Sequence, residues 1–403
     1  MKIGESVRSR LLFAPSCTFV ASISIWYGFR AGADEIIVGV RRPMSVLDHI
    51  RSGRTSCVCA VAFALALITA GLSTTGLITT GSAAAQTPEQ TPIRFSLDGR
   101  IEGPSALFLL PLDKGYYQGE SLDVTVDDAV NAFEPISRVA SGSYDMALAD
   151  INAVIRFRDQ NPTAPIRAIF MVYNRPPFAI VGRKSRGITD PKSLEGKRLG
   201  APPLTTTVQQ WPVFAKLNDV DPTKVTLEPI ATPVRVPMLA AGQLDAALGY
   251  SFRLFIDLKD RGVPVGDLVQ LQMADYKMRL YGAVIIVNSK FATDQPGAVR
   301  KFLRATVRGF RETIRNPTTA VEPVLRRVEH AKKDVEVERL RMAIRDNVIT
   351  PEVKANGFGA VDPMRLKEAI GQIALGYTFK TRPTADAVFD ASFLPPAAER
   401  RVN

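Results

Sequence analysis

A run of three threonines could hold an anionic group. Residues 204–211 read LTTTVQQW, and we expect them to open a helix in which Thr205, Thr206 and Thr207 place hydroxyls beside free backbone N–H groups. Such a helix start binds oxyanions such as sulfonate or nitrate. Plain N-capping by threonine is the structural alternative.

Two similar stretches each end in residues that could face a ligand. VASGSYDMALAD (139–150) and LAAGQLDAALGY (239–250) align without a gap, and each reads as a helix end, a glycine stop, an aspartate and a short buried strand. Chance recurrence is the alternative, but five identities in twelve positions favour two similar lobes. The candidates at and just after the ends of these strands are Asp150, Asn152, Tyr250, Ser251 and Phe252.

Two of these candidates carry specific expectations. Asp150 could accept a hydrogen bond from a ligand amine, or it could cap the helix that we expect to begin near Ile151. Tyr250 is the main candidate, because its hydroxyl and ring suit a small polar or aromatic ligand. We therefore expect Tyr250→Ala to weaken ligand binding and to leave the fold nearly intact.

Other side chains are candidates for the same cleft. Tyr173 and Asn174 end an apolar strand, and they would line the cleft floor or pack near a hinge. Trp211 is the only tryptophan after residue 85, and it would stack on a flat ligand or fill the core. The remaining candidates are Arg235, Asp275 and Tyr276.

The residue types of nucleophilic and metal catalysis are scarce. No cysteine follows residue 85, and the single histidine there, His330, lies in the charged segment VEHAKKD. A Ser-His-Asp triad would depend on that histidine, no Cys/His pattern offers a metal site, and the phosphate-binding motif GxxxxGK[ST] is absent. We therefore predict a protein that is not an enzyme and uses no cofactor or metal.

The composition is globular and argues against nucleic-acid binding. The 403 residues are 46% hydrophobic and 23% charged, and the Lys and Arg residues behind the net charge of +11 are scattered. A chain of this length predicts two domains.

The first 85 residues predict export. Residues 55–80 are apolar and uncharged, two arginines precede them, and small residues ending at Ala85 follow. This pattern is typical of a cleavable signal peptide, and a membrane anchor is the alternative. Met44 would begin a conventional signal peptide, so residues 1–43 would be an extension before the true start. After cleavage we expect a periplasmic protein that is not embedded in the membrane.

Strand-like and helix-like segments alternate after residue 92, which predicts an α/β fold. Two apolar strands, 178–183 and 281–288, frame a segment with its own strand–helix pattern, as expected for a lobe inserted across a two-strand hinge. We expect helices over 297–315 and 331–346 to be solvated outer helices of the first lobe. The predicted division is 1–85 (extension and signal peptide), 92–183 (lobe 1, first part), 184–280 (lobe 2) and 281–403 (return to lobe 1 and C-terminal helices).

Several stretches resemble one known family in their order along the chain. They are LDKGYYQGESLDVTV (112–126), RVASGSYDMALADINAVI (138–155), LEGKRLGAP (194–202), AVIIVNSKFATDQPGAVRKFLRA (283–305) and the closing NGFGAVDPMRLKEAIGQIALGYTF. Together they are similar to the NMT1/THI5-like solute-binding proteins, the nitrate/sulfonate/taurine and thiamine-pyrimidine receptors of ABC importers. The resemblance implies a type II periplasmic binding protein, with two α/β lobes, a two-strand hinge and a ligand clamped between the lobes.

The resemblance also implies ligand contacts in the loop after the first strand. Arg100, Glu102 and Ser105 lie in this loop, but the aromatic residue that the family usually carries there is replaced by Arg100-Ile101. Stacking from this loop is therefore in doubt. The polarity of the ligand stays open, because an anion would favour the threonines with arginine, and an aminopyrimidine or amine would favour Asp150, Glu102 and the aromatic residues.

These expectations combine into one function. We predict a periplasmic solute-binding subunit of an ABC importer, which captures a nitrate-, sulfonate- or taurine-like anion or a thiamine-pyrimidine-like compound and delivers it to a permease and, through it, to an ATPase. One alternative is a receptor that feeds a sensor system. The other is an enzyme like the eukaryotic pyrimidine synthases of the superfamily, which depend on Cys and His residues that are largely missing here.

Overall fold

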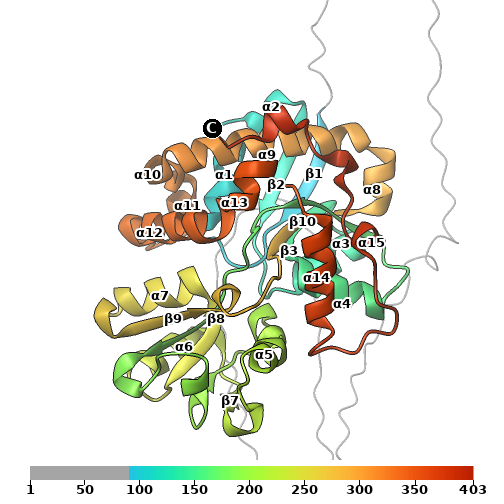
Figure 1. Ribbon diagram of the computed structural model, residues 1–403. Coiled ribbons are helices and arrows are strands. Elements are labelled where there is room, and N and C mark those ends of the chain that lie inside the picture. Colours follow the sequence, from blue (N-terminus) through green and yellow to red (C-terminus); the bar gives the residue numbers. More distant parts are fainter. Residues whose placement is uncertain (1–89, 403) are drawn as a thin grey trace, which may run out of the picture. The chain divides into compact units, whose positions relative to one another are not determined.

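The computed structural model describes residues 90–402 of the chain (Figure 1). The predicted extension and signal peptide, residues 1–85, lie outside the described residues. Among the residues from 90 to 402, no helix is both long enough and apolar enough to cross a membrane.

Two five-stranded sheets of the same topology organise the described chain. The strand order is β2-β1-β3-β10-β4 in the first sheet and β7-β6-β8-β5-β9 in the second. We call the first sheet with its helices lobe 1 and the second sheet with its helices lobe 2. The strands of lobe 1 are β1 (Thr91–Ser96), β2 (Leu122–Asp127), β3 (Met146–Asp150), β4 (Ile166–Met171) and β10 (Ala283–Asn288). Those of lobe 2 are β5 (Phe178–Arg183), β6 (Arg198–Gly200), β7 (Thr226–Glu228), β8 (Ala246–Tyr250) and β9 (Leu268–Gln272).

Each sheet contains one strand that runs against its neighbours. Strand β10 is antiparallel to β3 and β4, and β5 is antiparallel to β8 and β9, whereas the other pairings are parallel. The central strands β3, β8 and β10 are buried along their whole length. Strands that are covered on both faces read as continuous apolar runs, which explains why the sequence predicts them well. The predicted α/β fold with two lobes is confirmed.

The two similar stretches of sequence have the same structural role in each lobe. Gly142 and Gly242 both adopt a left-handed backbone conformation, with φ of 77° and 72°, after helices α3 and α6. Asp145 and Asp245 then each accept a hydrogen bond from the backbone of the neighbouring strand, at 2.8 Å from Arg94 N and 2.9 Å from Arg198 N. The repeat therefore reflects two similar lobes, as predicted, and it positions the ends of β3 and β8.

Helices cover the sheets of both lobes (Figure 1). Those of lobe 2 are α5 (Thr206–Leu217), α6 (Thr232–Ala240) and α7 (Ser251–Asp260). Those of lobe 1 before the crossing are α1 (Ala106–Asp113), α2 (Tyr116–Gly119), α3 (Glu134–Ala140) and α4 (Ile151–Gln160). Those after it are α8 (Ser289–Asp294), α9 (Pro296–Arg315), α10 (Pro317–Ala320), α11 (Glu322–Arg327), α12 (Lys333–Ala343), α13 (Pro351–Asn356), α14 (Pro363–Ile373) and α15 (Ala385–Val388), with a π-helical turn at Ile344–Val348.

The outer helix predicted over 297–315 is confirmed as α9. Its apolar face packs on α1, where the rings of Phe108 and Phe310 lie 5.7 Å apart at a steep angle. Its arginines are spaced along the sequence between these apolar positions, so the helix is amphipathic.

The segment predicted over 331–346 lies on lobe 1 as expected, where Val337 and Leu340 share a core cluster with Leu109, but it is not a solvated helix. Helix α12 packs against α7 of lobe 2, with Arg339 only 3% exposed. The guanidinium of Arg339 donates to Asp257 Oδ1 at 2.8 Å and to the Phe252 carbonyl at 3.2 Å, and it pairs with Glu336 at 3.1 Å. The charged sequence of α12 indicated exposure. Instead, Arg339 is buried between the lobes and is paired with Glu336 of α12 and Asp257 of α7.

Two segments cross between the sheets, at residues 172–177 and 273–282. Strand β5, which we expected in lobe 1, pairs with β8 and β9 in the second sheet. The first crossing therefore precedes residue 178, and the second precedes β10. This is the arrangement of a two-segment hinge.

Arg365 of helix α14 makes hydrogen bonds to both crossing segments. The guanidinium of Arg365 donates to Asn174 O and to Leu280 O, each at 2.8 Å, and it pairs with Glu352 at 2.9 Å. It also lies 3.9 Å from the centre of the Tyr281 ring. The C-terminal helices therefore hold the hinge from outside.

Candidate functional site

A small cavity lies where the two lobes meet. Its volume is about 10 Å³, which is room for about one water molecule. Most of its lining belongs to lobe 1, and Arg253 comes from lobe 2. The lining residues are Leu97, Asp98, Glu102, Pro104, Ser105, Phe108, Leu148, Tyr173 and Arg253.

The residues around this cavity are positioned by the carboxyl ends of parallel strands. Asp98 follows β1, and Asp150 and Tyr250 are the last residues of β3 and β8. In lobe 2 the chain leaves β6 and enters α5 at Thr205. Open α/β sheets bind ligands at this edge, because helix starts and loops converge there. The two sheets thus present equivalent ends to the space between the lobes.

Asp98 brings a carboxylate oxygen with no partner to the cavity. Its Oδ2 atom is buried and makes no hydrogen bond. Burial raises the pKa of Asp98; the charge of Arg253 opposes this rise, and that of Glu102 adds to it. A buried oxygen of this kind calls for a hydrogen-bond donor.

Glu102 and Arg253 form a buried ion pair across the lobes. Glu102 is 4% exposed, and Arg253 Nε donates to its Oε1. Burial would raise the pKa of Glu102, but Arg253, Arg339 and Arg100 outweigh burial and hold it below its usual value. The Arg253 guanidinium also lies 4.9 Å from the centre of the Tyr250 ring. The guanidinium of Arg253 is therefore already paired with groups of the protein.

Asp150 takes the capping role that the sequence allowed. Its Oδ1 accepts a hydrogen bond from Ala153 N at 3.0 Å, at the start of α4. Burial raises the pKa of Asp150 to about 7. Asn152 is fully buried, and its Nδ2 donates to Tyr281 O at 2.8 Å, whereas its Oδ1 has no partner.

The threonine run begins α5 without a side-chain cap. The Thr205 hydroxyl donates back to Pro202 O at 3.0 Å instead of accepting from the helix. Thr206 lies 3.5 Å from the Tyr250 hydroxyl, and the buried Thr207 hydroxyl has no partner. Leu204 precedes them in a left-handed conformation with φ of 58°, and it is exposed. The first N–H groups of α5 are therefore left free of side-chain caps.

Tyr250 belongs to a buried aromatic cluster. It is 8% exposed, and its ring centre lies 5.6 Å from that of Phe252 and 6.2 Å from that of Phe178. Phe252 in turn meets Tyr173 at 6.1 Å. Tyr250→Ala would remove a buried ring, so we now expect this variant to lose stability as well as ligand binding.

The remaining candidates occupy varied positions. Ser105 accepts a hydrogen bond from Glu102 N at 3.1 Å, and the exposed Arg100 pairs with Glu102 and Asp257. Ser251 is buried at the start of α7, and its hydroxyl has no partner. Trp211 is buried in the core, with its ring centre 6.1 Å from that of Phe214.

Of the predicted site residues, only Glu102, Ser105 and Tyr173 line the cavity. Asn174, Asp275 and Tyr276 belong to the crossing segments, where Asp275 pairs with Arg175 of the other segment. Arg235 is buried on α6 and donates to Leu248 O; burial lowers the pKa of Arg235 to about 10.

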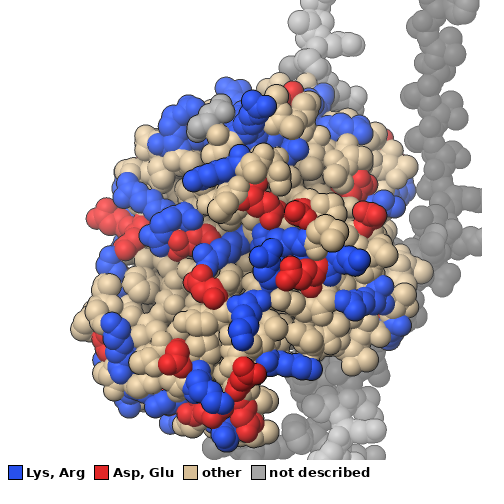
Figure 2. Space-filling model, viewed as in Figure 1, with Lys and Arg blue, Asp and Glu red and all other residues tan. Residues whose placement is uncertain are grey.

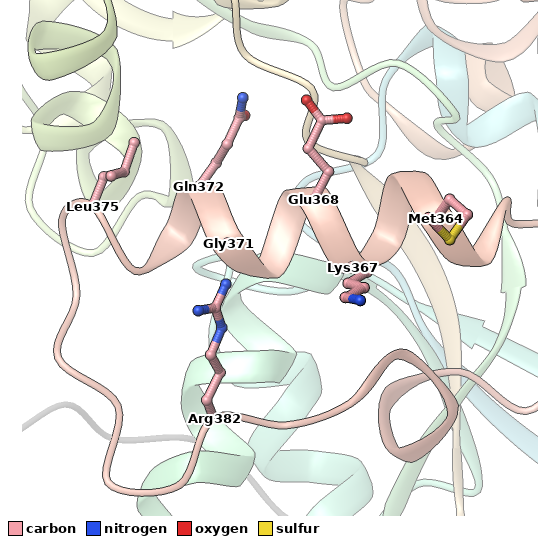
Figure 3. A pocket seen from close by; sticks show the side chains of 7 residues that line it. All are labelled: Met364, Lys367, Glu368, Gly371, Gln372, Leu375 and Arg382. Carbon is pink, nitrogen blue, oxygen red and sulfur yellow. The ribbon is translucent and has the colours of Figure 1, made fainter.

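A larger groove of about 510 Å³ lies beside α14 (Figure 3). Gln372 on this helix is fully paired, accepting from Arg279 N at 2.8 Å and donating to Lys277 O at 2.9 Å. Figure 3 shows Arg382 reaching toward Gly371 from the loop that follows the helix. The groove takes all its lining from lobe 1 and contains no buried polar atom without a partner, so we place the site at the cavity between the lobes.

On the face shown in Figure 2, Lys and Arg are mixed with Asp and Glu across the middle and the lower part, and Lys and Arg predominate toward the top. Across residues 90–402, no group of His, Cys, Asp and Glu side chains is arranged to hold a metal ion.

Sequence reasoning missed Asp98 and Arg253. Asp98 stands two residues past the end of β1, so the rule that selected Asp150 and Tyr250 at strand ends would have found it. Arg253 lies in the first turn of α7, three residues after Tyr250. No local signal marked Arg253, because its partner Glu102 is 151 residues away.

Curated relatives of this chain include binding proteins and enzymes. The formylaminopyrimidine-binding protein of Halalkalibacterium halodurans is 24% identical over 69% of this chain and 83% of its own length. The riboflavin-binding protein of Chloroflexus aurantiacus is 25% identical over 54% of this chain and 61% of its own. The 4-amino-5-hydroxymethyl-2-methylpyrimidine phosphate synthase of Schizosaccharomyces pombe is 21% identical over 51% and 60%.

Solved structures and a family model agree with the fold. The alkanesulfonate-binding protein of Xanthomonas axonopodis pv. citri, solved with MOPS, superposes with a TM-score of 0.57 at 13% identity, covering 75% of this chain and 99% of that protein. This likeness shows a periplasmic binding protein fold. The NMT1/THI5-like family model matches residues 105–320, which is more than half of the sequence. The chain therefore belongs to the NMT1/THI5-like family.

Proposed function

We propose that this protein captures a small solute between its two lobes and delivers it to the permease of an ABC importer, whose ATPase drives transport. The observation that supports this most is the cavity at the strand ends, where Asp98 of lobe 1 faces the same space as Arg253 of lobe 2. A receptor needs groups from both lobes, because ligand binding is then coupled to closure of the lobes.

The cavity supports a mechanism of opening and closing. It has room for about one water molecule, so a solute enters only when the lobes separate. The two crossing segments at residues 172–177 and 273–282 are the natural hinge for this motion. Closure would then present one shape of the paired lobes to the permease.

The proposed location is the periplasm. The apolar segment 55–80 and the small residues that end at Ala85 support export through a cleaved signal peptide. Sequencing the amino terminus of the protein isolated from cells tests this, and we expect it to begin at residue 86. An amino terminus upstream of residue 55 would contradict cleavage.

The similarity to fungal pyrimidine phosphate synthases supports an enzyme as the second candidate. We favour the receptor, since His330, the only histidine among the described residues, is exposed and does not line the cavity. Measurement of 4-amino-5-hydroxymethyl-2-methylpyrimidine phosphate in cells that express the protein tests the synthase, and we expect no increase over cells without it. Formation of that product would establish the enzyme instead.

The direct test of solute capture is mass spectrometry of the purified protein. A tightly binding receptor carries its solute through purification, so denaturation should release a small molecule in about a one-to-one ratio. Tyr250→Phe keeps the ring in the aromatic cluster and removes only the hydroxyl beside Thr206. We expect this variant to fold normally and to retain less solute.

A thermal-shift screen supplies the second arm of this test. A solute present at a hundred times its dissociation constant stabilises the folded state by about 2.7 kcal/mol, which raises the melting temperature visibly. If no small molecule copurifies and none of a broad panel of solutes stabilises the protein, the proposed function is wrong.

A further inference from the structure

One side of helix α9 carries a row of arginines. The helix contains six cationic side chains and one carboxylate. Five of the cations recur every three or four residues, so at about 100° per residue they lie within an arc of roughly 80° and span about 22 Å of the helix axis. We call these five residues the arginine face of α9: Arg300, Arg304, Arg308, Arg311 and Arg315.

Two arginines of this face are held by aromatic rings. The guanidinium of Arg308 lies 3.8 Å from the centre of the Tyr116 ring, and that of Arg300 lies 5.4 Å from the centre of the Phe393 ring. Both arginines are exposed at the surface. A ring face attracts a guanidinium but does not cancel its charge, so these two cations are oriented and still positive.

The other contacts of the face cancel little of its charge. The Nη2 atom of Arg311 donates to the backbone carbonyls of Glu399 at 2.7 Å and Arg401 at 3.1 Å, which are uncharged partners. Arg304 pairs with the carboxylate of Glu120 at 2.7 Å. The arginine face therefore keeps a net positive charge after its contacts within lobe 1 are made.

Helix α9 differs in this respect from the equally charged α12. The carboxylate of α9, Glu312, lies beside the arginine face and pairs with Lys114 at 3.2 Å. In α12 the buried Arg339 pairs with Glu336 of the same helix and with Asp257 of lobe 2. The charges of α12 thus serve contacts within the protein, whereas most of the arginine face has only uncharged partners there.

The arginine face lies on lobe 1 at a distance from the cleft. Figure 1 shows α9 along the top of lobe 1, with lobe 2 at the bottom, and Lys and Arg predominate toward the top in the same view of Figure 2. The cavity between the lobes takes no lining from α9. The opposite side of the helix is buried, with Phe302 and Phe310 at 0% exposure. Only the polar side of α9 can therefore meet a partner.

We propose that the arginine face of α9 binds the phosphate groups of an anionic phospholipid bilayer and holds the protein on the membrane surface. A row of cations matches a plane of headgroups, whereas a single phosphate needs groups that converge on it. Guanidinium groups bind phosphate through two parallel hydrogen bonds, and clusters of basic residues are attracted to anionic lipids. Because the apolar side of α9 is in the core, the helix stays outside the hydrocarbon layer.

This inference goes beyond the proposed function and does not depend on the solute. Contact through lobe 1 leaves the cavity between the lobes away from the membrane, so solute exchange and membrane binding are compatible. Attraction by charge alone is screened by salt, and we expect the binding to be fully reversible.

Co-sedimentation with lipid vesicles tests the inference on the protein isolated from cells that express the full chain. Vesicles of phosphatidylglycerol and phosphatidylcholine in equal parts are compared with vesicles of phosphatidylcholine alone. At low salt we expect at least about tenfold more binding to the anionic vesicles, and release from them at about 1 M NaCl. An uncleaved apolar segment 55–80 would bind both kinds of vesicle, so the difference between them reports the arginine face.

A triple variant removes the exposed arginines of the face. Arg300→Gln, Arg308→Gln and Arg315→Gln together should lower the partition coefficient on anionic vesicles by at least about tenfold, since each basic residue near the surface adds to the attraction. The control variant removes three exposed cations of lobe 2, so both variants have the same net charge. The control changes are Lys184→Gln, Lys216→Gln and Arg261→Gln.

The control should bind anionic vesicles nearly as the wild type does. Circular dichroism checks the fold of both variants, and Arg315→Glu alone, which reverses one exposed charge, should weaken binding in the same direction. Equal losses in the two triple variants would show that net charge alone decides, and would overturn the inference. Equal binding of the wild-type protein to both kinds of vesicle would overturn it as well.

A nucleic acid is the competing partner for a basic surface. Binding of duplex DNA that the arginine substitutions abolish, without binding to anionic vesicles, would assign the face to a polynucleotide and overturn the inference. None of these assays contains a solute. A failure of solute capture therefore leaves membrane binding standing, and a failure of membrane binding leaves the proposed function standing.

Discussion

Arg253 and Glu102 illustrate how single residues tie the lobes together. A buried pair gains little over an apolar pair, but removal of one partner leaves a desolvated charge. The Arg253 guanidinium lies against Gly99, where an added Cβ would be 3.3 Å from its Nη2 atom. Gly99, in the loop after β1, therefore leaves room for Arg253, which is the residue of lobe 2 that lines the cavity.

Glu102→Gln should destabilise the protein strongly, because Arg253 would lose its charged partner. We expect the free energy of unfolding to fall by about 3 kcal/mol in urea denaturation at pH 7. Glu338→Gln removes the partner of Lys259 in an exposed pair at 2.6 Å, and it should change stability by less than about 1 kcal/mol. Equal effects of the two substitutions would show that burial of the Glu102 pair is unimportant.

Asp150 gives the fold a predictable pH dependence. Burial raises its pKa from 3.8 to about 7, so the folded state binds a proton more tightly than the unfolded state. The stability from this group is complete below about pH 4 and is lost as the pH rises to about 7. Asp150→Asn still offers an oxygen to the start of α4 but cannot titrate.

The measurement for Asp150 is the melting temperature against pH. From pH 4 to pH 8, Asp150→Asn should gain stability relative to the wild type, by up to roughly 4 kcal/mol. Asp123→Asn, which is exposed, should show no such trend. Parallel curves for Asp150→Asn and the wild type would mean that Asp150 is ionised throughout.

At the scale of elements, buried strands and repeated joints could be predicted from the sequence, but the role of α12 could not. The strand over 178–183 matches β5, because a run buried on both faces is apolar throughout. Helix α12 carries many charges, and exposure is the usual meaning of such a segment. Its burial depends on Asp257, a partner 82 residues from Arg339 in the chain. Local patterns do not record such pairings.

The hydrogen bonds of Arg365 to the two crossing segments lead to a prediction for α14. Arg365→Lys keeps the charge but loses the planar fork that reaches Asn174 O and Leu280 O together. We expect a lower melting temperature and a larger radius of gyration in solution scattering, because the crossing segments would be held less firmly. Lys367→Ala, an exposed change on the same helix, should leave both quantities unchanged. If Arg365→Lys changed neither the melting temperature nor the radius of gyration, the hydrogen bonds of Arg365 would not be needed to hold the crossing segments.

For the molecule as a whole, the two-lobe plan followed from the sequence, and the details of the site did not. Repeated stretches 100 residues apart indicated equivalent lobes, and the sheet orders agree. Asp98 and Arg253 gain their significance only when β1 and α7 come together across the lobes. Site residues that act across a cleft are therefore harder to predict than the strands that carry them.

Contacts between the lobes should differ in their sensitivity to salt. Two exposed ion pairs connect α7 with α12 and the residue before it. They are Lys259 with Glu338 and Asp260 with Lys332. Exposed pairs are screened by salt and contribute about 0–1 kcal/mol each. A double variant, Lys259→Ala with Lys332→Ala, should therefore lose the small salt dependence of stability between 0.05 and 1 M NaCl, roughly the range over which screening becomes complete. If the free energy of unfolding of this double variant fell by several kcal/mol, the exposed pairs would contribute more than we expect.

The central claim is that a solute binds between the lobes. The most direct measurement is the electron density of crystals grown from protein that carries its copurified or best-binding solute. The account predicts density between Asp98 of lobe 1 and the start of α5 in lobe 2, with the lobes closed around it. Density confined to the groove beside α14, or an empty cleft in crystals whose protein binds solute in solution, would contradict it.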